Sequence, residues 1–488
     1  MEKTEADVRK LYMSAAPCSL DLGDGSERGE YVNQDYILRK LGRPHRAISL
    51  MYCYYPYDKE WPQRISEAWK DRQVSFAWDY PYDDYFPYGG GRGGDTQGEP
   101  FASMRDVRRH GQDVALTLTM DPNLTDEDLI AVANDLRPFG RMLLRINHEA
   151  DGNWFSFNKR ATYGQVGAFF VRACNIIHEH APNVKVILCI DGIETLGDEH
   201  IKQEEAFAPA VRAADCWSTD KYPALHWGWP YDVAEPGGTT QKRESVRGNY
   251  ELIRATAKRF AELNNGAAKP MYVNEMNADG DVTGPYDQAA MVKEFADILS
   301  REKPEWFDGF TLYQFRDRGR LGLEIEDPNN PDVGIEQPVM ATYRKILHSR
   351  YFSPVIRAKG AATLPVTLRW GGSEDAEGLG MTVHFEGNPH FCEAVFREDS
   401  NLMLELNGTW FYKAPGTKRV DLMSAFFEKP LKKPTDLCLK IFAPPASGEN
   451  DLSLPDGLVN SYTTIETLPE LRILYGPVMP AIVSSDSF

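Results

Sequence analysis

Short apolar runs alternate with longer amphipathic stretches along the middle of the chain. Runs such as DVALTLT and VKVILCI are rich in β-branched residues, and each predicts a buried strand. Eight runs have this character: Arg46–Tyr52, Gln73–Trp78, Asp113–Thr119, Met142–Asn147, Val184–Ile190, Cys216–Lys221, Pro270–Asn274 and Gly309–Phe315.

Helical patterns fall between the apolar runs. Thr125 followed by Asp128 resembles the capping box that opens a helix. Other helical stretches are Tyr163–His180, Glu244–Asn264, Asp287–Glu302 and Gln337–Ser349. Eight strands that alternate with helices predict an α/β protein of the (β/α)8 TIM-barrel type.

A doubly wound sheet is the alternative to a barrel. It predicts a glycine-rich turn after the first strand, where the backbone approaches a pyrophosphate. The first run is followed instead by CYYPY at Cys53–Tyr57. These bulky side chains leave no room for such a ligand, so the sequence favours the barrel.

The pattern of apolar and turn-forming residues changes after Ser349. Short apolar runs such as Leu402–Leu406 and Thr409–Lys413 are separated by Gly, Pro, Asn and Asp, which is typical of a β-sandwich. We therefore expect three parts: an N-terminal extension packed on the barrel at residues 1–45, the barrel at residues 46–352 and a β-sandwich accessory domain at residues 353–488.

The charge balance excludes some classes of partner. The 488 residues include 54 Lys and Arg against 72 Asp and Glu, a net charge of −18. A nucleic-acid-binding protein presents a basic surface, and anionic membranes attract one, so we expect neither partner. The seven cysteines contain no CxxC pair, and reduced, buried thiols are the simpler interpretation.

No run is long and apolar enough to predict a membrane-spanning helix. The N-terminal segment Met1–Asp7, MEKTEAD, lacks the apolar core of a signal peptide. The protein is therefore expected to be cytoplasmic. A secreted protein from which the signal had been trimmed would look the same.

Aromatic and acidic residues follow the predicted strands. In a TIM barrel these strand ends form the active-site face. Rings stack on the flat faces of sugars, and cleavage of a glycosidic bond needs two carboxyl groups. Glu149 follows the fourth run and Glu275 the seventh; further candidates for substrate binding at strand ends are Asp79, Tyr222, Trp227, Trp229 and Tyr313.

Two segments resemble a known family. RINHEADGNWF at Arg145–Phe155 resembles the acid/base motif of glycoside hydrolase family 26, the endo-β-mannanases, which has Arg, two residues, His-Glu, then Gly and a Trp-aromatic pair. MYVNE at Met271–Glu275 resembles the nucleophile segment of the same family. The family belongs to a clan of retaining barrels that carry these two groups on strands four and seven.

The resemblance implies roles for individual residues. Glu149 would be the acid/base and Glu275 the nucleophile. His148 would hydrogen-bond the sugar, and Arg145 would lie beneath the carboxylates and favour the charged form of Glu275. Tyr222 would hydrogen-bond the nucleophile. An aromatic wall of the cleft would come from Trp154.

The expected function is retaining hydrolysis of a neutral β-linked glycan, with β-mannan, β-1,3-xylan and β-glucan as candidates. No cofactor or metal is expected, and the protein would be a monomer or small homo-oligomer. The sequence departs from the mannanase pattern at Ala150-Asp151, and the last run ends in Tyr313-Gln314-Phe315-Arg316 where a Trp is expected. An exo-acting glycosidase of the same clan and a non-catalytic carbohydrate-binding protein are therefore kept as alternatives.

Several features have simpler alternatives. If the strand count is wrong by one, Glu324 or Asp220 would compete for the nucleophile role. The Gly89–Gly94 segment lacks the Lys-Ser/Thr of a P-loop and predicts a flexible loop at the cleft rim. Glu326–Asp332 lacks EF-hand spacing and predicts a solvated turn. In the accessory domain, exposure of Trp370, Trp410 and Phe411 would indicate glycan binding, and their burial would indicate a bracing role.

Overall fold

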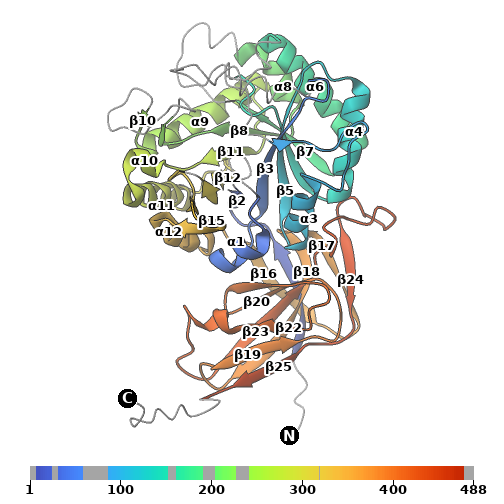
Figure 1. The fold of residues 1–488 in the computed structure, drawn as a ribbon, viewed down its shortest axis with the longest axis vertical. Coiled ribbons are helices and arrows are strands. Elements are labelled where there is room, and N and C mark those ends of the chain that lie inside the picture. Colours follow the sequence, from blue (N-terminus) through green and yellow to red (C-terminus); the bar gives the residue numbers. More distant parts are fainter. Residues whose placement is uncertain are drawn as a thin grey trace.

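The computed structural model describes residues 7–24, 31–58, 86–151, 161–190, 204–226, 241–317 and 319–476. Figure 1 shows a barrel surrounded by helices, with antiparallel β-sheets packed beneath it. Both parts of the predicted fold class are confirmed. Within the described ranges, no helix is both long and apolar enough to cross a membrane.

Eight parallel strands close the barrel. Each pairs with the next around the ring, and β2 pairs with both β3 and β12 to complete it. A short strand, β4 (Phe86–Pro87), pairs with the end of β3. The ring consists of β2 (Ser19–Gly23), β3 (Ala47–Tyr54), β5 (Asp113–Met120), β6 (Met142–Ile146), β7 (Val184–Cys189), β8 (Cys216–Asp220), β11 (Met271–Met276) and β12 (Gly309–Leu312).

The first barrel strand lies in the segment that we expected to be an extension. All five residues of β2 are buried, but Ser19 and Asp21 interrupt the continuous apolar run that predicts a fully buried strand. Asp21 is accommodated because it forms an ion pair with Arg46 at the start of the next strand. The expected division at residue 46 is therefore wrong, because it cuts the barrel between its first and second strands.

The predicted run Gln73–Trp78 lies outside the described residues. The full length of β3 pairs directly with β5, from Ala47 opposite Asp113 to Tyr54 opposite Met120. With β2 counted as the first strand of the ring, β6 remains the fourth and β11 the seventh. The ring of described strands closes without that run, and the expected strand numbers of the two glutamates are unchanged.

Helices cover the outside of the ring (Figure 1). The predicted capping box at the start of α4 is present, because the Thr125 side chain and the Asp128 side chain each accept from the other's backbone N–H. A second box, Thr162 with Gln165, opens α6. The helices are α1 (Gln34–Leu41), α3 (Phe101–Arg109), α4 (Asp126–Leu136), α6 (Tyr163–His180), α8 (Ala208–Ala213), α9 (Val246–Leu263), α10 (Gly280–Thr283), α11 (Pro285–Glu302) and α12 (Pro338–Leu347).

Small β elements lie between the barrel units. Strands β9 (Ala224–His226) and β10 (Gln241–Arg243) pair with each other in antiparallel fashion. After the last barrel strand, β13 (Arg316–Asp317), β14 (Glu324–Asp327) and β15 (Asn330–Glu336) form a small sheet. The expected solvated turn is the link between β14 and β15, where the Asn329 backbone N–H donates to Asp327.

Two antiparallel sheets form the C-terminal part, and their facing sides share one hydrophobic core that includes Leu379, Phe385 and Ala394. The larger sheet also contains β1 (Val8–Ser14), which lies between β16 and β18. Its other strands are β16 (Val355–Ala361), β17 (Val366–Gly372), β18 (Asp375–Phe385), β20 (Leu402–Leu406), β21 (Thr409–Lys413), β23 (Thr435–Phe442) and β24 (Ser461–Ile465). The smaller sheet contains β19 (Phe391–Val395), β22 (Arg419–Asp421) and β25 (Glu470–Leu474).

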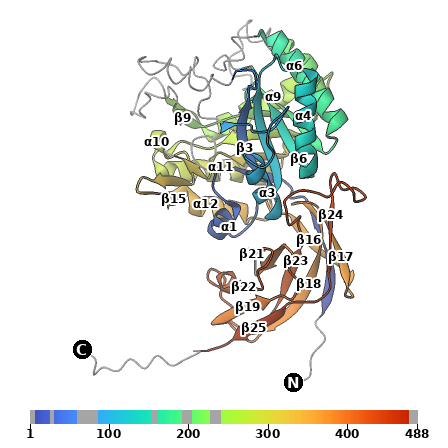
Figure 2. The same cartoon turned by 45° about the vertical axis from the view of Figure 1, so that its right-hand side comes forward.

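The larger sheet packs against the underside of the barrel, as the turned view in Figure 2 shows. Trp370 is 1% exposed and Trp410 is 7% exposed. Both belong to a cluster that includes Leu38 of α1, on the barrel side. Phe411 is half-buried. The two tryptophans thus meet the condition for a bracing role, whereas Phe411 meets it only in part.

Candidate active site

Arg145 is the centre of a buried hydrogen-bond network at the C-terminal ends of the barrel strands. It lies on β6, and its side chain is 2% exposed. Nη2 donates to Glu275 Oε1 at 2.7 Å, and Nη1 donates to Asp220 Oδ2 at 2.9 Å. Nε donates to Thr117 Oγ1 at 2.7 Å. One guanidinium therefore joins side chains from β5, β8 and β11.

A tight turn follows β6 and presents the next side chains. Asn147 has φ 57° and Glu149 has φ 43°, both in the left-handed region. The Asn147 side chain accepts a hydrogen bond from the Met120 backbone N–H at 2.8 Å, which fixes the turn to β5. Such backbone conformations cost about 1–3 kcal/mol each and persist where surrounding contacts hold them. This strained turn projects His148 and Glu149 over the end of the barrel.

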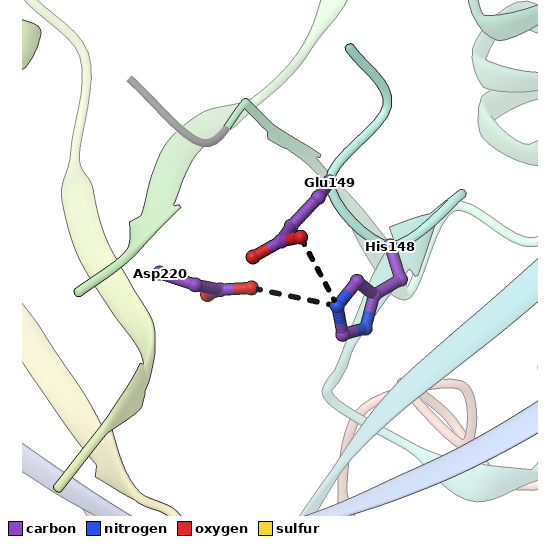
Figure 3. Close-up of side chains that lie close together, drawn as sticks. All are labelled: His148, Glu149 and Asp220. Carbon is purple, nitrogen blue, oxygen red and sulfur yellow. Dashed lines mark ion pairs between the residues drawn. The ribbon is translucent and has the colours of Figure 1, made fainter. Parts of the chain in front are cut away.

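The His148 ring lies among three carboxyl groups. Its Nδ1 is 3.3 Å from Glu275 Oε1, and its Nε2 is 3.7 Å from Glu149 Oε2. The same Nε2 is 4.0 Å from Asp220 Oδ2, as Figure 3 shows. Glu149 and Glu275, from different strands, therefore approach the two nitrogens of one imidazole. The two glutamates expected after the fourth and seventh strands thus both lie beside His148.

Opposing effects act on the pKa of Glu275. Burial by itself raises its pKa, but the charges of His148 and Arg145 lower it, as do hydrogen bonds from Arg145 and Tyr222. The net pKa of Glu275 lies below its usual value. The Tyr222 hydroxyl donates to Glu275 Oε2 at 2.8 Å, so both carboxylate oxygens have donors. This environment stabilises the ionised form.

The pKa of Asp220 is shifted in the opposite direction. Burial and the nearby negative charge of Glu275 raise its pKa well above the usual range, although Arg145 lowers it. Two carboxyl groups that share one guanidinium cannot both ionise without repelling each other. The arrangement therefore favours an ionised Glu275 beside a protonated Asp220.

The donor atoms of His148, Glu149 and Asp220 lie within 4.8 Å of one another, close enough to be considered as a metal site. The guanidinium of Arg145 occupies one side of Asp220 at 2.9 Å. A divalent cation bound there would be repelled by that charge and would require the Asp220 carboxyl to lose its proton. The donor set therefore fits a metal poorly.

The structure brings together six of the ten residues proposed from sequence. Arg145, His148, Glu149, Tyr222 and Glu275 form the network described above. Tyr313 packs edge-on against Tyr222, with ring centroids 6.1 Å apart. The remaining four lie outside the described residues: Asp79, Trp154, Trp227 and Trp229.

The structure also shows the contacts of Asp220 and Glu324, the two alternatives for the nucleophile role. Asp220 is part of the network, but as a partner of Arg145. Glu324 is fully buried on β14, where the Tyr36 hydroxyl and the Arg316 guanidinium donate to it. This is an ion-pair cluster between α1 and the small sheet, which gives Glu324 a structural role.

Sequence reasoning missed Thr117 and the pairing of Arg145 with Asp220. A signal was available, since an arginine inside a buried strand needs buried acceptors. Which residues supply them depends on strand register, because Thr117 of β5 lies directly opposite Arg145 of β6. Register between separate strands is not visible in the local pattern.

The glycine-rich segment differs from the expected flexible loop. The Gly91 backbone N–H donates to Asp135 Oδ2 at 2.6 Å, and the Arg92 N–H donates to the Tyr54 hydroxyl at 3.2 Å. Gly91 has φ +81°, and a Cβ there would lie 2.0 Å from the Tyr54 hydroxyl. The segment is packed on the barrel rim, and glycine is required for the close approach.

No protein-family model and no curated protein matches the chain. Among solved structures it is similar to a family 51 α-L-arabinofuranosidase from Bifidobacterium longum, with 11% identity, a TM-score of 0.43 and coverage of 90% of this chain and 100% of that one. It is also similar to a family 39 glycoside hydrolase from Bacteroides cellulosilyticus, with 12% identity, a TM-score of 0.42 and coverage of 88% and 81%. A β-glycosidase from Pyrococcus horikoshii has 13% identity, a TM-score of 0.42 and coverage of 70% and 97%. Likeness of this degree carries no conclusion about activity, so a functional inference has to rest on the site itself.

Proposed function

We propose that this protein is a retaining glycoside hydrolase that cleaves β-glycosidic bonds of a neutral glycan. The supporting observation is the pair of glutamates on either side of His148, one of them kept ionised by Arg145 and Tyr222. A double displacement needs one carboxylate as nucleophile and a second carboxyl group that can carry a proton.

In the proposed reaction, Glu275 attacks the anomeric carbon while Glu149 donates its proton to the departing glycosidic oxygen. The bond to the leaving sugar breaks, and a glycosyl ester forms on Glu275. Glu149, now ionised, then takes a proton from water, and the resulting hydroxyl displaces Glu275 from the sugar. Both carboxyl groups return to their initial states, and the anomeric configuration is retained.

The substrate class is inferred from the family 26 resemblance of Arg145–Phe155 and from charge. A net charge of −18 disfavours polyanionic glycans, so we propose a neutral β-linked chain. β-Mannan is the first candidate, with β-1,3-xylan and β-glucan next. A non-catalytic binding protein on the same fold would have no need of an ionised Glu275 within reach of a second carboxyl group.

The test compares wild type with Glu149→Ala and Glu275→Ala on a panel of β-linked oligosaccharides, with product anomers followed by NMR. We expect the retained anomer first, and a fall in kcat of roughly 10²–10⁴-fold or more in each variant. Glu294→Ala, at an exposed position on α11, is the matched control and should behave as wild type.

Rescue by azide distinguishes the acid/base role from the nucleophile role. In Glu149→Ala, azide can displace Glu275 without base assistance, so activity on substrates with good leaving groups should return as a β-glycosyl azide. Wild type that binds sugars without cleaving any would support the non-catalytic alternative. Full activity of Glu275→Ala would show that the nucleophile lies elsewhere.

A further inference from the structure

Thr117 is the third partner of Arg145. The two residues lie opposite each other on the parallel strands β5 and β6. Arg145 Nε donates to Thr117 Oγ1 at 2.7 Å, and both side chains lie in the buried interior, with each residue 2% exposed. The contact is therefore shielded from water, which cannot replace it if it is lost.

The guanidinium is a rigid plane with five N–H donors in fixed directions. Its two terminal nitrogens donate to Asp220 and Glu275. The sulfur atoms of Met51 and Cys189 also lie near it, at 3.7 and 3.9 Å, but sulfur accepts hydrogen bonds only weakly. The hydroxyl at Nε is thus the third oxygen partner of the plane, and the rotation of the plane decides which carboxyl group each nitrogen meets.

We propose that Thr117 is a positioning residue of the active site, whose hydroxyl orients Arg145 so that one terminal nitrogen meets Glu275 and the other meets Asp220. The inference deepens the proposed function and rests on it. It assigns a specific task to a strand residue that does not touch the substrate.

Thr117→Val is the informative change, because it keeps the β-branched shape and removes the acceptor. Nε would be left without its oxygen partner, and Arg145 would turn to find another. Glu275 would then lose part of its stabilising contact, and a larger fraction of it would be protonated at low pH. We expect kcat/KM to fall roughly tenfold to a hundredfold, the range for one hydrogen bond to a charged group, and its acid limb to move to higher pH. Thr117→Ser should restore both.

The experiment measures kcat/KM against pH for full-length wild type, Thr117→Val, Thr117→Ser and a matched control, Thr256→Val. Thr256 is a buried threonine on α9, and its hydroxyl bonds only to the helix backbone at Leu252 among the contacts described. This control should lose some thermal stability without moving the acid limb. If Thr117→Val does not fold, Thr117→Ala takes its place.

A second readout does not need activity. The carboxyl carbon of Glu275 is followed by ¹³C NMR in protein labelled at glutamate, with Glu275→Gln identifying the signal. Titration of this signal at higher pH in Thr117→Val than in wild type and Thr117→Ser supports the proposal. Unchanged titration and an unchanged acid limb would overturn it. Inactive wild type with a shifted titration would instead contradict the proposed function and leave the positioning role supported.

Discussion

At the scale of single residues, the protonation states of two carboxyl groups depend on their shared hydrogen-bond donor, the Arg145 guanidinium. Arg145 donates to both Glu275 and Asp220, yet the pKa of Glu275 lies below its usual value and that of Asp220 lies well above. The difference arises from the additional partners. Tyr222 and His148 stabilise negative charge on Glu275, whereas the charge of Glu275 itself opposes ionisation of Asp220.

The asymmetry predicts a pH-dependent effect of Asp220→Asn. Because folding raises the pKa of Asp220, its contribution to stability is fully present below its unfolded pKa of about 3.9 and is lost as pH rises toward the folded value. Asparagine stays neutral and has no such loss. The melting temperature of Asp220→Asn relative to wild type should therefore increase between about pH 4 and pH 8.

Thermal melts of both proteins across that range check the prediction. Asp297→Asn, at a partly exposed aspartate on α11 that pairs with Lys293, is the control, and its difference from wild type should change little with pH. A relative melting temperature of Asp220→Asn that falls with rising pH would contradict the assigned protonation state.

At the scale of elements, the rim is built by close backbone packing. The Gly89–Gly94 segment joins the end of β4 to the region before α3 and contacts the Tyr54 ring at the end of β3. Tyr54 in turn packs edge-on against Tyr88, with centroids 5.4 Å apart. Two of the sequence's tyrosines thus pack on each other, and the glycines allow the loop to cover them.

Gly91→Ala should destabilise the protein by more than its backbone conformation alone requires. The added methyl group would collide with the Tyr54 hydroxyl, 2.0 Å from the ideal Cβ position. Gly266→Ala is a matched control, because Gly266 also has positive φ, at +84°, but has no atom within 4 Å of its Cβ position. The control should cost about 1 kcal/mol.

Denaturant unfolding of the two variants measures the difference. We expect Gly91→Ala to lose clearly more free energy of unfolding than Gly266→Ala. Equal losses would mean that the rim loop moves aside at no cost and does not hold Tyr54 in position.

At the scale of the whole molecule, the chain passes between its two parts twice. It begins with β1 in the larger C-terminal sheet, enters the barrel at β2 and returns to the sheet at β16. Between the parts, Trp370 and Trp410 are buried in one cluster. A domain that contains strands from both sides of the barrel sequence and joins the barrel through a buried cluster is expected to unfold together with it.

Trp370→Ala tests this coupling. Removal of a buried tryptophan costs about 3–5 kcal/mol, and because the cluster joins both parts, the whole molecule should melt at a lower temperature in one calorimetric transition. Tyr462→Ala, on β24 at 39% exposure, is the control and should change the melting temperature little. Two separate transitions in Trp370→Ala would show that the parts unfold independently.

Local pattern is enough to predict much of this protein. Apolar runs identify barrel strands such as Asp113–Thr119, and Thr125 with Asp128 predicts a helix start, because burial and capping are decided within a few residues. Glu149 is likewise a candidate from its place after the fourth apolar run, and the resemblance of Arg145–Phe155 to the family 26 motif adds Arg145 and His148.

Tertiary structure decided what depends on distant partners. Strand β2 closes the barrel although polar Asp21 interrupts it, because Arg46, directly before the next strand, pairs with that carboxylate. Arg145 meets Glu275 across 130 residues of sequence. No local periodicity in the sequence encodes such a pairing. The pairing in turn affects the ionisation of both Glu275 and Asp220. The sequence by itself therefore determined the elements and the candidate groups, whereas register and packing decided which of these groups share a charge.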